Sequence, residues 1–219
     1  MGGNHICGKS LKDRIPLVWV RSRPHHQGMT TADTPQDLTG KLLIAMPGMG
    51  DPRFEHTVVF LCAHSNEGAM GLIVNKRVPE IALDDLLAQL EIATGDGSHG
   101  HAVHFGGPVE GARGFVLHSG DAPDYPGTLQ VDKGFAMTAT RDILVDIARG
   151  DGPDNTLAAL GYSGWGPGQL ENELRQNAWL TVDADTAIVF DPDDRSKWVR
   201  ALKSLGIDPL VLSSDGGSA

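Results

Sequence analysis

Short apolar runs separated by turn-forming residues dominate the first part of the chain. The runs at 41–46 (KLLIAM), 57–64 (TVVFLCAH) and 69–76 (AMGLIVNK) are mostly apolar, with β-branched residues prominent in the last two, which predicts three buried strands. Residues 65–68 (SNEG) form turns readily, so the second and third strands should pair as a hairpin. Further strands are expected at 102–105, 114–118, 128–131, 135–138, 156–162, 179–182 and 187–191.

Other segments place apolar residues at helical spacing. Pro79 is expected in the first turn of one helix, Thr140 to cap a second, and Asp193 or Asp194 to cap a third. Their apolar stripes are Ile81, Leu83, Leu86, Leu87 and Leu90, then Ile143, Leu144 and Ile147, then Trp198, Leu202 and Leu205. A short fourth helix is expected to begin near Pro167.

This order of elements predicts an α+β fold with a largely antiparallel or mixed sheet and three to four helices, because strands and helices do not alternate regularly. No repeat or linker divides residues 38–210, which we expect to form a single domain. Residues 1–37 are expected to be a disordered basic leader, with Met29 as an alternative start and a targeting role as the other reading. Residues 211–219 are expected to be a flexible tail.

Charge is distributed unevenly along the chain. Residues 1–28 hold five basic residues and one acidic residue, a net charge of +4. The net charge of the whole chain is −10, so the remaining residues, 13 basic and 27 acidic, carry −14. A body with this charge repels phosphate backbones, which argues against direct nucleic-acid binding.

Cysteine content and hydropathy bear on location. Two cysteines in 219 residues provide no disulfide framework, so a reducing, cytoplasmic setting is expected. No apolar run is long enough to span a membrane, and none has the features of a signal peptide.

The segment 160–180 (LGYSGWGPGQLENELRQNAWL) combines glycines with two tryptophans and a short polar helix. A glycine-rich turn before a helix can bind phosphate through backbone N–H groups. Pro167, however, has no N–H, and the carboxylates of Glu171 and Glu173 would repel an anion. A phosphate site is therefore disfavoured here.

We instead interpret this segment, which is rich in glycine from Gly161 onward, as a sharp corner between a strand and a helix, with Trp165 and Trp179 clamping it. The alternative is recognition of a partner through Gln169 and Glu171.

Cys62 and His64 are two residues apart in a predicted strand, so both should project from one face. A histidine can activate a cysteine nucleophile, but no third, orienting group is evident. An inert, buried Cys62 is the favoured interpretation.

His99, His101 and His104 (SHGHAVH) have the most metal-like spacing in the chain. In an extended segment His104 faces away from the other two, so three ligands on one ion would require the loop to curl. A histidine-rich surface loop is favoured over a metal site, and no cofactor is predicted.

Gly106, Gly107 and Pro108 end a strand and should turn the backbone sharply, with a positive φ at one glycine. Asn75, at the end of GLIVN, is expected to cap or bridge to that turn. Both features are interpreted first as architecture.

Four motifs in the same order resemble the AlgH-like (YqgE-like) family over about residues 38–210. They are LIAMPGMGDPRFEHTVVFLCAHSNEGAMGLIVNK, FGGPVEGARGFVLHSG, MTATRD and LGYSGWGPGQLENELRQNAWL. The resemblance implies a bifurcated sheet curled into a pseudo-barrel. It also implies a regulatory role, since members are often labelled transcriptional regulators, but it supplies no catalytic residues. Family chains differ in the loop holding His99 and His101.

The sequence therefore favours a non-enzymatic, cytoplasmic regulatory or interaction protein that acts indirectly rather than by binding DNA, through an unidentified protein partner or small ligand. The alternative is a ligand-binding protein or enzyme with a pocket near Cys62 and His64, Gly106–Pro108 and Gly161–Glu171. The oligomeric state is left open.

Overall fold

The computed structural model describes residues 37–48 and 51–212. These residues all belong to one compact unit, 35–219. Apart from Asp37, the predicted leader 1–37 lies outside the described residues, and so do residues 213–219 of the predicted tail. Within the described part, no helix has the length and hydropathy required to cross a membrane.

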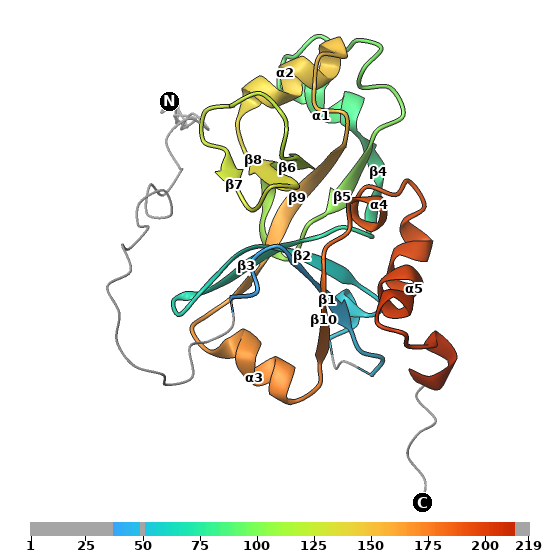
Figure 1. Cartoon of the computed structure of the whole chain (residues 1–219). Coiled ribbons are helices and arrows are strands. Elements are labelled where there is room, and N and C mark those ends of the chain that lie inside the picture. The colour runs from blue at the N-terminus through green and yellow to red at the C-terminus, as the bar shows by residue number, and fades with distance from the viewer. Residues whose placement is uncertain (1–36, 49–50, 213–219) are drawn as a thin grey trace, which may run out of the picture. The chain divides into compact units, whose positions relative to one another are not determined.

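Ten strands and five α-helices follow one another without regular alternation in the described residues (Figure 1). The strands are β1 Lys41–Ala45, β2 Val58–Ser65, β3 Gly68–Ile73, β4 Arg77–Ala82, β5 Ala102–Phe105, β6 Val109–Ser119, β7 Leu129–Gln130, β8 Phe135–Thr138, β9 Thr156–Trp165 and β10 Trp179–Asp183. The helices are α1 Leu83–Gln89, α2 Arg141–Arg149, α3 Gln169–Arg175, α4 Thr186–Val189 and α5 Asp194–Ser204, with short 3-10 helices at η3 Pro52–Phe54 and η4 Pro209–Leu212.

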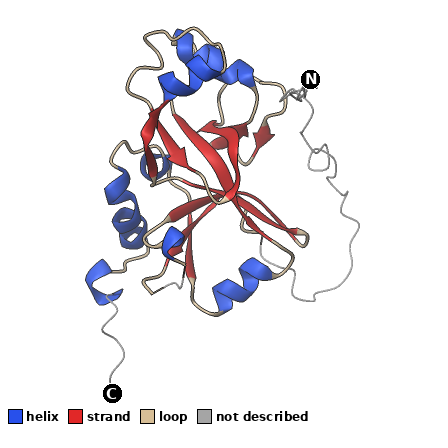
Figure 2. Ribbon diagram, turned by 180° about the vertical axis from the view of Figure 1, so that it is seen from behind, coloured by secondary structure: helices blue, strands red, loops and turns tan. Residues whose placement is uncertain are grey.

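The sheet is antiparallel along the order β10-β1-β2-β3-β9-β6-β8-β7 and strongly curled (Figure 2). A branch leaves it at β9, where β5 pairs in parallel with β9 and β4 pairs with β5. The long strand β9 belongs to both halves of the sheet, one containing β1, β2, β3 and β10 and the other containing β4 to β8. Its residues 156–160 pair with β5 and β6, whereas residues 163–165 pair with β3. The α+β class and the bifurcated sheet expected from the sequence are therefore confirmed.

The change of partner along β9 coincides with Gly161, whose φ is +70°. A Cβ atom at this position would lie 2.5 Å from the carbonyl oxygen of Gly107. Gly107 itself has a φ of +153°, and a side chain there would overlap the backbone of Tyr162. Two backbone segments thus meet where only glycine fits, which confirms the positive φ expected within Gly106–Pro108.

Helices cover the sheet in three places, and each makes a hydrophobic cluster with it. Alternate residues of β2 face two of these clusters: Val58 and Phe60 join α4 and α5, whereas Val59 and Leu61 face α3. The third cluster packs α1 and α2 against β5, β6 and β9. The ring of Phe135 from β8 lies 4.7 Å from that of Phe60 and 5.7 Å from that of Phe190, so the curl of the sheet encloses the first cluster.

The helix predicted from Pro79 begins later, because residues 77–82 form strand β4. β4 pairs only with β5 among the described strands, and proline is tolerated on such an edge because its missing N–H removes no ladder bond. Asp85 fixes the start of α1 at Leu83, since its carboxylate accepts a hydrogen bond from Ala82 N at 2.9 Å.

The strand predicted at 187–191 is also wrong. Residues 186–189 form the single turn of α4, whose first N–H groups are capped by Asp185, which accepts from Ala187 N at 2.8 Å. Ile188 and Val189 are buried in either conformation, so their apolar character did not distinguish strand from helix.

Candidate functional site

An open groove of about 590 Å³ lies beside α3. One wall comes from the segment before β2, including Met46 and Phe54. The opposite wall comes from the end of β9, from α3 and from the residues that connect α3 to β10. Pro108 also contributes to the lining.

Two buried tryptophans meet at the groove. Trp165, the last residue of β9, and Trp179, the first of β10, pack edge to face with ring centroids 6.0 Å apart. Their indole N–H groups donate to the same atom, Glu173 Oε2, at 2.9 Å from Trp165 and 2.8 Å from Trp179. The tryptophans thereby tie both flanking strands to helix α3, in agreement with the predicted clamp.

Gln169 completes the arrangement around this carboxylate. Its Nε2 donates to Glu173 Oε1 at 2.9 Å, across one turn of α3, and its Oε1 accepts from Gly166 N at 3.1 Å. Glu173 therefore accepts from three N–H donors, all uncharged. From its position in the sequence, Glu173 is expected only as a charge unfavourable to phosphate, and this role is not predicted. The signal that could have revealed it is the i, i+4 pairing with Gln169 between two tryptophans.

Helix α3 ends in a turn that sets the position of Trp179. Asn177 has a φ of +55°, and its N–H donates to Leu174 O at 3.0 Å, while Ala178 N donates to Glu173 O at 2.9 Å. This bonding pattern is the Schellman motif, in which asparagine can take the left-handed residue. The side chains of Gln176 and Asn177 are exposed, line the groove and have no hydrogen-bond partner within residues 37–48 and 51–212.

The wall formed by the segment before β2 carries one ion pair, between Arg53 and Asp51. Arg53 donates from Nε to Asp51 Oδ1 at 3.0 Å and from Nη2 to Asp51 Oδ2 at 2.6 Å. These hydrogen bonds from Arg53 lower the pKa of Asp51 below its ordinary value. Phe54 contacts Trp179 edge to face with ring centroids 5.6 Å apart.

Cys62 and His64 do not share a face, contrary to the prediction. A β-bulge between Leu61 and Ala63 shifts the register against β3 and reverses the alternation beyond it. Cys62 consequently lies in the cluster with α4 and α5, and burial raises the pKa of its thiol to about 12. This is the inert, buried cysteine that the sequence favoured.

His64 instead faces α3. Leu38 N donates to Nδ1 at 3.3 Å, so the proton resides on Nε2, which donates to Glu171 Oε1 at 2.9 Å. A hydrogen bond within the Glu171 residue itself and the bond from His64 outweigh desolvation and lower the pKa of the Glu171 carboxyl. Glu171 is therefore hydrogen-bonded to His64, and it is not among the residues that line the groove.

Asn75 does not bridge to the Gly106–Pro108 turn as expected. Its Oδ1 accepts from Val58 N at 2.8 Å and its Nδ2 donates to His56 O at 2.9 Å, so it fastens the start of β2. The turn itself is held by backbone bonds, since Gly106 N donates to Leu160 O and Gly106 O accepts from Ile73 N, both at 2.9 Å.

The alternative hypothesis from the sequence is a pocket near Cys62 and His64, Gly106–Pro108 and Gly161–Glu171. Among those residues, Pro108, Gly164, Trp165 and Gln169 line the groove, whereas Gly106, Gly107 and Gly161 form the backbone joint described above.

The three histidines considered as metal ligands have separate environments. His99 is exposed and pairs with Asp84 Oδ2 at 2.8 Å, and His101 is exposed. His104 is buried and contacts Asp194 at 3.2 Å. No group of three candidate ligands is found within the described residues. His99 and His101 thus belong to a surface loop, and His104 belongs to the sheet.

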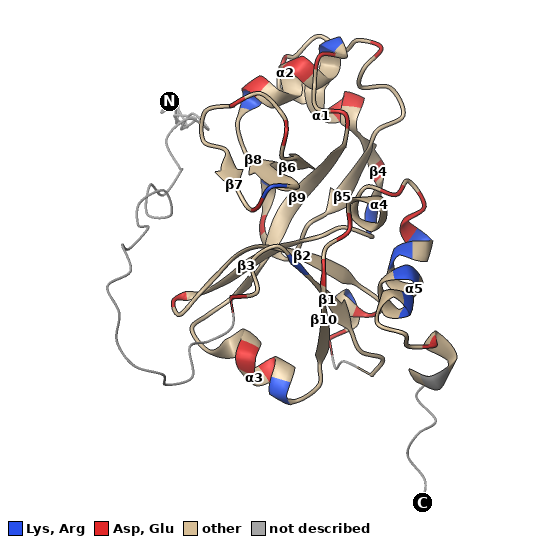
Figure 3. Cartoon of the chain, viewed as in Figure 1, with Lys and Arg blue, Asp and Glu red and all other residues tan. Residues whose placement is uncertain are grey.

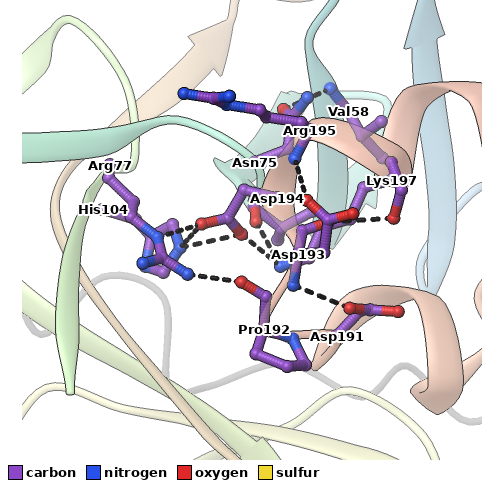
Figure 4. Close-up of polar contacts among 12 residues, drawn as sticks. Val58, Asn75, Arg77, His104, Asp191, Pro192, Asp193, Asp194, Arg195 and Lys197 are labelled. Carbon is purple, nitrogen blue, oxygen red and sulfur yellow. Dashed lines mark hydrogen bonds and ion pairs between the residues drawn. The ribbon is translucent and has the colours of Figure 1, made fainter. Parts of the chain in front are cut away.

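A buried ionic cluster at Asp194 was not anticipated from the sequence (Figure 4). The carboxylate of Asp194, on α5, contacts His104 of β5, Arg77 of β4 and Lys197 Nζ, the last at 2.8 Å. Lys197 is almost fully buried and also donates to Val74 O at 2.7 Å. The cluster joins α5 to the β4–β5 branch and to the end of β3.

Opposing effects act on the charges of this cluster. Burial alone would raise the pKa of Asp194, but hydrogen bonds from His104, Lys197 and Arg77 outweigh it and hold the pKa well below its ordinary value. Burial lowers the pKa of Lys197, and Asp194 offsets part of that effect. Asp194 and Lys197 are both shielded from solvent, so we assign the cluster a structural role.

Among the described residues, helix α5 carries the densest group of basic residues (Figure 3). Its basic residues are Arg195, Lys197, Arg200 and Lys203. Lys197 is buried on Asp194, and Arg200 pairs with Asp191, so half of this positive charge is already neutralised.

Comparisons of the sequence and of the fold with known proteins agree with each other. A family model described as AlgH-like matches residues 42–210. The UPF0301 protein of Ruegeria pomeroyi is 61% identical over 187 residues, covering 84% of this chain and all of the relative. The UPF0301 protein of Paracoccus denitrificans is 55% identical over 194 residues, covering 85% of this chain and all of the relative.

Two solved structures have the same fold. The solution structure of AlgH from Pseudomonas aeruginosa aligns with a TM-score of 0.68 and 40% identity, over 87% of this chain and all of that one. A crystal structure of a Corynebacterium diphtheriae protein aligns with a TM-score of 0.62 at 18% identity, over 84% and 92% of the two chains. With the family model spanning most of the chain, this protein belongs to the AlgH-like family.

Proposed function

We propose that this protein is a non-enzymatic interaction protein that binds a segment of a partner protein in the groove beside α3. One observation carries the proposal: a carboxylate in the groove is fixed by three hydrogen bonds, while the rim, formed by the exposed residues Gln176 and Asn177, presents amide groups without such bonds among the described residues. Trp165, Trp179 and Gln169 fix the carboxylate of Glu173, whereas the exposed amides of Gln176 and Asn177 have no partner among the described residues. Amide groups of this kind can bind the backbone of an extended segment.

The chemistry of the groove supports binding rather than catalysis. Its lining residues include no histidine, cysteine, serine or lysine among the described positions. The nearest catalytic candidates from the sequence are used elsewhere, since Cys62 is in the core and His64 is engaged with Leu38 and Glu171. A serine, cysteine or lysine nucleophile with an adjacent histidine base is thus absent from the described lining.

A regulatory role for the protein would be indirect. The net charge of −14 outside residues 1–28 opposes a duplex, and the basic face of α5 is partly neutralised by Asp194 and Asp191. We place this role in the cytoplasm, in keeping with a free thiol at Cys62. A filter-binding assay tests whether regulation is indirect, because tight, salt-sensitive retention of duplex DNA would show that the protein binds DNA directly.

Site-specific photo-crosslinking tests the groove. A photoreactive residue placed at Gln176 should give a discrete cross-linked product in cells. The same residue placed at Glu80, exposed on β4 and outside the groove lining, should not. The product should also disappear when Pro108→Trp, at an exposed lining position, fills the groove. Equal products from both positions, no product from Gln176, or a product that survives Pro108→Trp would contradict the proposal.

A further inference from the structure

The carboxylate of Glu173 has an unusual set of neighbours for an acidic side chain in a groove. Oε2 accepts from two indole N–H groups, and Oε1 accepts from one amide N–H. No ion pair to Glu173 is found within the described part of the chain. Its negative charge is therefore held in place by neutral donors and is not balanced by a neighbouring cation.

The other two charged residues that line the groove, Asp51 and Arg53, form an ion pair with each other. Arg53 is the only basic residue among the described lining residues, and its guanidinium lies on Asp51 at 2.6 Å. Arg175, on α3, is not a lining residue, and it donates to the neutral amide oxygen of Asn172. Asp51, Arg53 and Glu173 together give the lining a net charge of −1, and this charge is located at Glu173.

The surroundings of the carboxylate favour a positive guest. Phe54, which is only half-buried, lines the groove, and aromatic rings attract cations through their electron-rich faces. Among residues 37–48 and 51–212, Oε1 accepts a single hydrogen bond, from Gln169, so it retains capacity for a further donor. The amide oxygens of Gln176 and Asn177 are additional acceptors on the rim.

We propose that the groove receives a cationic side chain of the partner segment, arginine in preference to lysine, with its guanidinium on Glu173. This rests on the function proposed above and specifies the chemistry of the partner. A guanidinium suits the site better than an ammonium, because its planar fork of five donors can contact the carboxylate and the rim amides together and can also stack on a ring. The acidic body of the protein would favour the approach of a basic segment.

Indole NMR signals provide a direct test, because the two N–H groups bonded to Glu173 report on its environment. The probes are three capped pentapeptides, with arginine, lysine or citrulline between pairs of glycines. Citrulline has nearly the shape of arginine without its charge. The indole signals of Trp165 and Trp179 are assigned by single Trp→Phe variants. Trp198, which donates to Ala45 O at 2.9 Å in the core, is the internal reference.

The arginine peptide should shift the Trp165 and Trp179 signals in a saturable manner while the Trp198 signal stays in place. Its affinity should exceed that of the citrulline peptide by at least about tenfold, with the lysine peptide in between. Equal affinity for arginine and citrulline peptides, or no shift at millimolar arginine peptide, would overturn the inference.

A matched pair of variants separates charge from shape. Glu173→Gln should reduce affinity for the arginine peptide to that for the citrulline peptide. Glu171→Gln makes the same change two residues away, at the carboxylate that bonds His64, and should leave the preference intact. If Glu173→Gln does not fold, the wild-type salt dependence decides: added salt should weaken binding of the arginine peptide but not of the citrulline peptide. If a photoreactive residue at Gln176 cross-links to a partner but the groove does not prefer the arginine peptide, this inference is disproved and the proposed function still holds.

Discussion

Trp165 and Trp179 are 14 positions apart in the chain, yet their rings pack edge to face and their N–H groups share one oxygen of Glu173. The segment between them forms α3, so the shared oxygen closes the helix onto the two strands that flank it. The carboxylate that we propose as the recognition group is thus also part of the structural joint. Its position should consequently change little when a partner binds.

Replacing Trp165 by alanine should lower the free energy of unfolding by about 3–5 kcal/mol, because the side chain is 93% buried and its removal leaves a large cavity. Trp165→Phe, which removes the N–H donor and part of the ring, should cost less, about 1–3 kcal/mol. Urea denaturation measures both values. A thermal shift below one degree for Trp165→Ala would contradict the buried clamp.

Local sequence patterns were sufficient for most of the sheet. Apolar runs located β1, β2 and β3, and the short turn at 65–68 gave the correct hairpin. The family resemblance, not the patterns, supplied the branch in the sheet. The patterns failed where an apolar stripe continued across a boundary between elements, as at Pro79, where the hydrogen bond from Ala82 N to Asp85 fixes where the helix starts.

The candidate site was predictable only where its residues are neighbours in sequence. Trp165, Gln169 and Trp179 fall within one motif and could be found. The opposite faces of Cys62 and His64 depend on a β-bulge, which the residue types alone do not indicate. The Asp194 cluster draws on residues at 77, 104, 194 and 197, so no local pattern could reveal it.

Asp194→Asn should destabilise the protein by about 3–5 kcal/mol, because Lys197 would remain buried without its counter-charge. Asp183→Asn is the control, since Asp183 pairs with Lys41 at the surface and has 90% of its side chain exposed. That variant should match the wild type closely in urea denaturation. Equal stability of the two variants would mean that the cluster contributes no more than a surface pair.

Acid should weaken the fold through the same carboxylate. The pKa of Asp194 is lower in the folded protein than the value of about 3.9 for an unfolded chain. The unfolded state therefore binds the proton more readily. The stabilisation is complete above about pH 5, begins to fall as the pH drops below about 4, and is fully lost only below the depressed pKa of the folded state. The stability difference between wild type and Asp194→Asn should be constant from pH 7 to 5 and shrink toward pH 3. A difference that stays constant to pH 3 would contradict this assignment.

Cys62 should resist alkylation in the native protein. The thiolate is the reactive form, and with a pKa of about 12 and a buried side chain it is almost absent at pH 8. In a Cys7→Ser variant, where Cys62 is the only thiol, iodoacetamide should leave the native protein unmodified for hours and react fully in urea. Native reaction at the rate of a free thiol would show that the strand β2 opens readily.

The joint between the two halves of the sheet gives the last prediction. An alanine at Gly161 must adopt a φ of +70°, which costs about 1–2 kcal/mol for an L-residue, and its Cβ would also lie 2.5 Å from Gly107 O and 2.9 Å from Val109 O. Gly161→Ala should therefore destabilise the protein by more than the conformational cost alone. Gly114→Ala, in β6, is the control, because a Cβ at Gly114 meets no atom within 4 Å.

If the close approach matters, urea denaturation should place Gly161→Ala well below both Gly114→Ala and the wild type. Equal stability of the two variants would show that β9 can change partners without a glycine. That result would remove the physical reason for the backbone contact between Gly107 and Gly161, and the branch of the sheet would then depend on side-chain packing rather than on this contact.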